Sequence, residues 1–172
     1  MVFAGCTTQP STQNNAAALP SDVPSECATT NLVTIKSEKA GTVNPEVANS
    51  YFNNWRSDSA QLVFANYAVD PIDIYSNITA GRVLTVINLT HGDGTKLTTG
   101  TFYKDTTVNG EAVNKQATEF NISTVDLAGG VFDENAKVEV KFINDKYACG
   151  EITSDDGSSS IKGNFIAKYL TQ

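Results

Sequence analysis

Short segments in which apolar and polar residues alternate, separated by turn residues, constrain the fold of this chain more than any other feature. Residues 137–143 read Lys-Val-Glu-Val-Lys-Phe-Ile, so Val138, Val140 and Phe142 are expected on one face of a strand. Comparable segments recur about every 10–15 residues from residue 31 to residue 170, with Gly, Asn and Asp between them. The spacing predicts an all-β domain of about eight or nine short strands.

The expected strands are joined by turns whose sequences favour antiparallel pairing. The strands are residues 31–39, 62–67, 72–75, 82–90, 97–104, 117–125, 137–143, 147–153 and 161–170, with 72–75 as an edge strand. The turn at residues 91–94 should close a hairpin between the strands on either side of it, and Asn109-Gly110 is a second hairpin-type turn. We predict an antiparallel β-sandwich, with a closed β-barrel as the alternative.

One helix is expected, over residues 45–55. Asn44 can cap it, Pro45 suits its first turn, and Glu46 complements the positive end of its dipole. Its apolar face would be Val47, Ala48, Tyr51, Phe52 and Trp55. Because several Asn residues weaken it, this helix should persist only when it packs on the sheet.

The charge balance excludes some classes of partner. The chain has 12 Lys and Arg residues against 19 Asp and Glu residues, a formal charge of −7. Nucleic acid is not an expected partner, because phosphate contacts need clustered Lys and Arg, and the sequence has no such cluster. No apolar run approaches the roughly 20 residues that span a bilayer. Any attachment to a membrane must therefore be covalent or through another protein.

The first residues suggest a covalent attachment. The sequence Ala4-Gly5-Cys6 follows a short apolar stretch and resembles the lipobox of bacterial lipoproteins. The resemblance implies that Cys6 carries a lipid and that the preceding residues are the remnant of a signal peptide. Thr7 after the cysteine, rather than Asp, implies sorting to the outer membrane of a Gram-negative cell.

The residues after Cys6 have the composition of a spacer. Residues 7–26 are poor in apolar side chains and contain Pro10, Pro20 and Pro24, which is typical of a flexible linker. We therefore divide the chain into residues 1–26, with the signal-peptide remnant, the lipidation site and the linker, and residues 27–172, a single β-sandwich domain.

The cysteine count fits this division. The chain has three cysteines, and lipidation of Cys6 leaves Cys27 and Cys149 to form a disulfide. The alternative is two buried reduced thiols.

The second half of the chain also resembles small bacterial surface lipoproteins of uncharacterised function. The similar motifs are Gly100-Thr101-Phe102, Cys149-Gly150-Glu151-Ile152 and Ile161-Lys162-Gly163-Asn164-Phe165. They imply a fold and a compartment, and no activity. The Gly-x-Trp signature of lipocalins is missing, since Asn53-Asn54 precede the only Trp, Trp55.

We find no catalytic constellation in the sequence and do not expect an enzyme. His91 is the only histidine and lies in an expected turn, and there is no Gly-x-Ser-x-Gly elbow. The carboxylate pairs Asp133-Glu134 and Asp155-Asp156 also fall in turns, where acidic residues are common for backbone reasons. No cofactor or metal is expected.

Two classes of function remain. The first is a lipid-anchored structural or interaction component of a bacterial surface or envelope assembly, on the periplasmic or the surface face. Its partners would be the membrane, through the lipid on Cys6, and an envelope or surface protein. The second is a ligand-binding module for glycan, peptide or calcium.

Overall fold

The structure is a computed structural model, which describes residues 21–27, 32–56 and 58–170. Its elements are all strands apart from a 3₁₀ turn at Val47–Asn49. The strands are β1 (Thr34–Ser37), β2 (Gly41–Val43), β3 (Ser50–Arg56), β4 (Ser59–Ala65), β5 (Leu84–His91), β6 (Gly100–Tyr103), β7 (Thr107–Val108), β8 (Glu111–Ala112), β9 (Lys115–Thr124), β10 (Leu127–Gly130), β11 (Lys137–Ile143), β12 (Tyr147–Asp155) and β13 (Ser160–Tyr169).

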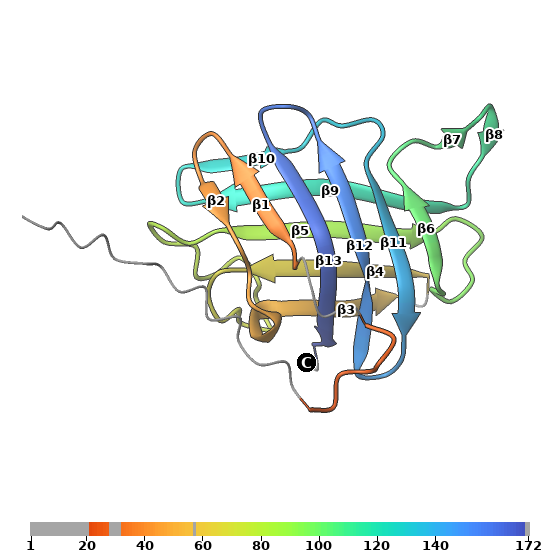
Figure 1. The fold of residues 1–172 in the computed structure, drawn as a ribbon, viewed down its shortest axis with the longest axis horizontal. Helices are drawn as coiled ribbons and strands as arrows, with labels where there is room; N and C mark the ends of the chain where they lie inside the picture. Colours follow the sequence, from red (N-terminus) through yellow and green to blue (C-terminus); the bar gives the residue numbers. More distant parts are fainter. Residues whose placement is uncertain (1–20, 28–31, 57, 171–172) are drawn as a thin grey trace, which may run out of the picture.

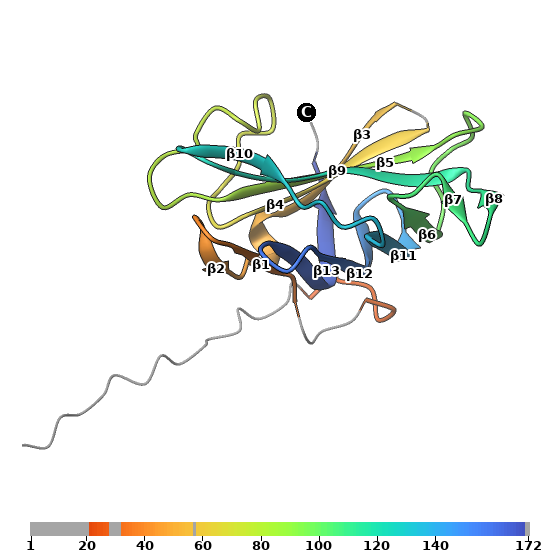
Figure 2. The same cartoon turned by 90° about the horizontal axis from the view of Figure 1, so that it is seen from above.

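The strands lie in two layers that face each other (Figure 2). One layer contains β2, β1, β13, β12, β11 and β6, and the other contains β3, β4, β5, β9 and β10. The strands of one layer run across those of the other (Figure 1), as in orthogonally packed β structures. The short hairpin β7–β8 projects away from both layers.

Two short parallel contacts close the layers into a barrel. At one corner β13 pairs with β3 through Lys168↔Tyr51 and Tyr169↔Phe52, and at the other β6 pairs with β9 through Tyr103↔Gln116. The result is a closed eight-stranded barrel, in the order β3-β4-β5-β9-β6-β11-β12-β13, and β1, β2 and β10 are attached to it. The prediction of a sandwich is therefore wrong, and the barrel alternative is confirmed. The alternating pattern could not separate the two, because the inward-facing positions are the same in both and only these corner contacts differ.

Side chains fill the interior of the barrel. Five phenylalanines are at most 1% exposed and come from both layers: Phe52, Phe64, Phe102, Phe120 and Phe165. Phe64 and Phe165 meet across the layers with ring centroids 6.1 Å apart in an edge-to-face arrangement. Each such side chain contributes about 1.5–3 kcal/mol by leaving water. Val33 and Ile35, two positions apart in the predicted strand at residues 31–39, both belong to this core.

The predicted helix over residues 45–55 is wrong. After one 3₁₀ turn, the chain continues as β3, which pairs with β4 from Ser50↔Phe64 onward. Phe52 points into the barrel core, whereas its neighbour Tyr51 packs in a cluster on the outer face. In a strand, successive side chains point to opposite faces, so two adjacent aromatic residues can be buried on both sides. In an amphipathic helix, both residues would have to fit on a single apolar face.

The turn at residues 91–94 does not close a hairpin. β5 pairs with β4 and β9, while β6 pairs with β11 and touches β9 at a single position. The second predicted turn is confirmed: Asn109 and Gly110 have φ values of 53° and 82° and join β7 to β8.

The strand at residues 137–143 is confirmed, but its alternation changes part-way. Val138 and Val140 point into the barrel core. A register shift between Val140 and Phe142 then turns the Phe142 side chain to the outer face, beside Cys149.

Candidate functional site

The longest connection in the domain, residues 66–83 between β4 and β5, folds back over the outer face of those two strands. It covers an apolar cluster outside the barrel, made of Val63, Ala65, Tyr67, Val69, Leu84 and Val86. Asn66 ties the two ends of the loop together, since its Nδ2 donates to the Gly81 carbonyl at 2.9 Å and its Oδ1 accepts the Val83 amide at 2.8 Å. The loop is therefore an Ω-loop, a kind of surface segment that often carries function.

The tip of this Ω-loop is ordered by two aspartates. The Asp70 carboxylate accepts the Ile72 amide at 2.9 Å, and the Asp73 carboxylate accepts the Tyr75 amide at 3.2 Å. Residues 72–75 therefore form turns, and the predicted edge strand there is wrong. Ile74 packs against the outer cluster, while Ile72 is 87% exposed and Tyr75 50% exposed. The loop thus presents a bare aliphatic side chain to solvent from a hydrogen-bonded backbone.

Arg82 fixes the base of the Ω-loop. Its guanidinium lies 4.9 Å from the centre of the Tyr67 ring, and its Nη1 donates to the Asn77 carbonyl at 2.9 Å. Burial raises the pKa of Tyr67, and the positive charge of Arg82 opposes this rise. The Tyr67 hydroxyl is buried and has no hydrogen-bond partner among the described residues.

A hollow of about 450 Å³ opens at the base of the Ω-loop. Residues 80–83 form one wall, and the turns at residues 39–40 and 124–126 form the others. It lies where the β1–β2 and β9–β10 hairpins approach each other at one end of the molecule (Figure 1). Val125, which is 55% exposed, is one of its lining residues. The Ω-loop tip and this hollow together are the candidate site.

Phe132 is a second exposed apolar side chain, on the connection between β10 and β11. It is 82% exposed, and the Lys104 ammonium lies 5.7 Å from the centre of its ring. Two carboxylates hold the backbone here: Asp156 accepts the Phe132 amide at 3.0 Å, and Asp133 accepts the Asp155 amide at 2.8 Å. Asp133, Asp155 and Asp156, three of the four residues of the acidic pairs noted in the sequence, therefore accept backbone amides, the structural use of such residues in turns.

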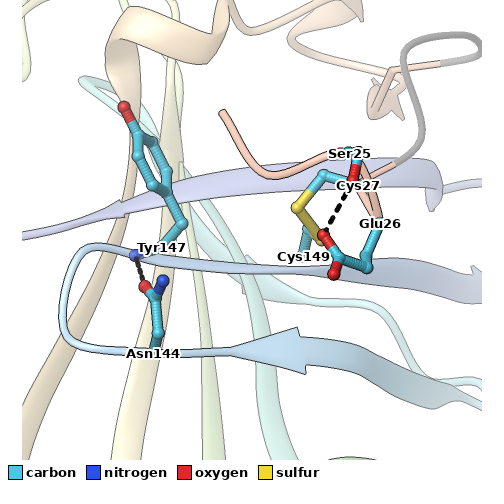
Figure 3. Close-up of a disulfide and its surroundings, with 6 residues drawn as sticks. All are labelled: Ser25, Glu26, Cys27, Asn144, Tyr147 and Cys149. Atoms are coloured by element: carbon cyan, nitrogen blue, oxygen red, sulfur yellow. Dashed lines mark hydrogen bonds between the residues drawn. A yellow bond between two sulfur atoms is a disulfide. The ribbon is translucent and has the colours of Figure 1, made fainter. Parts of the chain in front are cut away.

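The structure joins Cys27 and Cys149 by a disulfide, with their Cα atoms 5.6 Å apart (Figure 3). The bond fastens the segment at residues 21–27 to the outer face of β12. A second contact reinforces it, since the Tyr147 hydroxyl donates to Asp22 at 3.0 Å. Val47, Ile166 and Phe142 pack with the two cysteines in a small apolar cluster. Cys6 lies outside the described residues.

His91 belongs to a tight polar turn. Its Nδ1 lies 2.5 Å from the Asp93 carboxylate and 2.7 Å from the Thr95 hydroxyl. Hydrogen bonds from the Thr95 hydroxyl and amide, and then from His91, lower the pKa of Asp93 to about 2. Because its three members lie within five consecutive residues, the group orders the turn that leaves β5.

The described residues contain neither a metal-binding cluster nor a membrane-spanning helix. No cluster of three or more His, Cys, Asp or Glu side chains that could hold a metal ion occurs in this part of the chain. Within the same residues, no helix is long and apolar enough to cross a membrane.

Comparison of the chain with known protein families, with curated proteins and with solved structures finds no match.

Sequence reasoning missed the candidate site, although its local signals were present. Asp70-Pro71 and Asp73 are residue types that order turns, and two such signals so close together oppose a strand. The hollow had no sequence signal, because its walls come from three separate turns.

Proposed function

We propose that this protein is an interaction component of a bacterial cell-envelope assembly, anchored through a lipid on Cys6 in the outer membrane. The observation that carries the proposal is Ile72, an aliphatic side chain that is 87% exposed and held by a hydrogen-bonded turn on a packed loop. The half-exposed Tyr75 lies on the same loop, and exposed apolar surface rimmed by polar residues is common at protein–protein interfaces.

The disulfide supports the tether in this proposal. It fixes residues 21–27 to the middle of the sheet, so a linker that precedes them would leave the domain from a defined point. Cys6→Ser in the full-length precursor should release the protein from membranes. Unchanged retention on membranes would contradict the anchor.

Site-specific photo-crosslinking in the native cells tests the interaction role. A benzophenone amino acid in place of Ile72 should give one defined adduct with a single protein. The matched control is the same amino acid in place of Asp145, an exposed residue on the turn between β11 and β12. No adduct from position 72, or the same adducts from both positions, would contradict the proposal.

The second candidate function is a ligand-binding module, and the hollow at the base of the Ω-loop favours it. A volume of about 450 Å³ lies within the ~300–1,000 Å³ range of ligand sites in proteins. The hollow suits a peptide better than a glycan or calcium, because Ala40, which lines it, directly precedes the edge strand β2.

A further inference from the structure

The hollow at the base of the Ω-loop is lined by more basic than acidic side chains, in a chain whose net charge is −7. Lys39 and Arg82 line it, against one carboxylate, Asp126. None of the three forms an ion pair within the described residues. The two basic side chains are therefore available to an anion from outside this part of the chain.

Arg82 is already oriented for such an anion. It is half-buried, its guanidinium lies over the Tyr67 ring, and one N–H group is taken by the Asn77 carbonyl. Its other N–H groups have no acceptor among the described residues. A guanidinium that is held in place before binding loses little conformational entropy when it pairs with a carboxylate.

The shape of the hollow suits an extended chain. Its walls include the small residues Ala40, Ala80 and Gly81, which leave room close to the backbone. Ala40 directly precedes β2, which pairs with β1 and has no second strand partner among the described residues. An extended peptide can add hydrogen bonds along such an edge, which a sugar cannot do in the same way.

We propose that this hollow binds an acidic, extended peptide segment of the partner protein, with one carboxylate on Arg82 and a second near Lys39. The inference rests on the proposed interaction role and adds the chemistry of the partner. Lys39 is exposed, and Asp126 carries the charge opposite to that of Lys39 and Arg82, so substitutions at the three residues give separate readouts of the same contact.

Calorimetric titration of the purified full-length chain tests the proposal, with a blocked tetraglutamate peptide as the probe. The peptide should bind, and its affinity should fall as salt is raised, because the contact is electrostatic and partly exposed. A blocked tetraglutamine peptide of the same length should not bind. Absence of tetraglutamate binding, or equal affinity for the two peptides, would overturn the proposal.

Charge variants locate the binding. Lys39→Gln should weaken tetraglutamate binding by about two- to fivefold, as expected for an exposed charge. Arg82→Lys should weaken it by about tenfold, because a lysine cannot offer the bidentate geometry. Asp126→Asn should strengthen it by about twofold, since it removes the opposing charge.

A lysine far from the hollow provides the matched control for Lys39→Gln. Lys146→Gln, which removes an exposed lysine on the β11–β12 turn, should leave the affinity unchanged. If Arg82→Lys disturbs the Ω-loop, Lys39 and Asp126 still decide the question, because opposite shifts at these two positions are required. Equal effects of the Lys39 and Lys146 substitutions would place the peptide elsewhere and overturn the proposal.

Titration with a galacturonate tetramer tests the alternative that the hollow binds an acidic glycan. If the sugar binds in a Lys39-dependent way and tetraglutamate does not, the hollow is a site for acidic glycan and the peptide proposal fails. Failure of the peptide titration leaves the photo-crosslinking result at Ile72 untouched, so the two proposals are tested separately.

Discussion

The carboxylate of Asp156 accepts the backbone amide of Phe132 at 3.0 Å, although the two residues are 24 positions apart in the chain. The same carboxylate accepts the amides of Ser158 and Ser159, at 2.9 and 2.7 Å. One acidic side chain therefore orders its own turn between β12 and β13 and also fixes the connection that displays Phe132.

Replacing Asp156 by Ala should lower the free energy of unfolding by about 1–2 kcal/mol, because several backbone amides lose a charged acceptor. Urea denaturation followed by circular dichroism measures this change. Asp145→Ala is the control, since Asp145 is exposed and its side chain has no hydrogen bond in the described part of the chain. An equal effect of the two substitutions would show that the Asp156 contacts contribute nothing.

Stability should fall in acid. Backbone amide hydrogen bonds, first that of Phe132, hold the pKa of Asp156 well below its ordinary value, and the pKa of Asp93 is about 2. Between the ordinary carboxyl pKa of about 4 and these lower values, the unfolded chain binds more protons than the folded one. The free energy of unfolding should therefore decrease as the pH drops from about 4 towards 2. Denaturation midpoints across this range should show a shallower slope for Asp156→Asn; an identical slope would contradict the assignment.

The strands could be predicted from the sequence wherever alternation and turn residues agreed. The segment at residues 137–143 was placed correctly because Val138 and Val140 alternate with charged residues. The outward turn of Phe142 was not predictable, since a bulge depends on pairing with β12 and not on local sequence.

The closure of the barrel could not be predicted from the sequence either. It depends on contacts such as Tyr103↔Gln116, a single pair between strands that belong to different layers. The predicted helix over residues 45–55 was wrong for a related reason. Tyr51 and Phe52 are neighbours in the chain but pack in two different apolar clusters, on opposite faces of β3. Tertiary packing decided both features, and it overrode local propensity.

The pairing of Cys27 with Cys149 followed from counting cysteines, and the structure agrees with it. Replacing both cysteines by Ala should lower the free energy of unfolding by about 4 kcal/mol, because the bond closes a loop of 122 residues in the unfolded chain. Guanidinium denaturation measures the loss, and Cys6→Ala alone should leave the midpoint unchanged. A double variant as stable as the parent would show that the pair is not bonded in the native protein.

Gly150 should tolerate no side chain. A Cβ atom built there would lie 1.7 Å from the Glu139 carbonyl oxygen, on the paired strand β11, and 3.1 Å from the Phe165 ring. Gly150→Ala must therefore push β11 and β12 apart or displace a core phenylalanine, at a cost of more than about 3 kcal/mol. The matched control is Gly130→Ala on β10, whose new Cβ would meet Asn121 at an ordinary 3.5 Å. Thermal unfolding should separate the two variants clearly. Similar melting temperatures would mean that β11 and β12 do not pair in the register described.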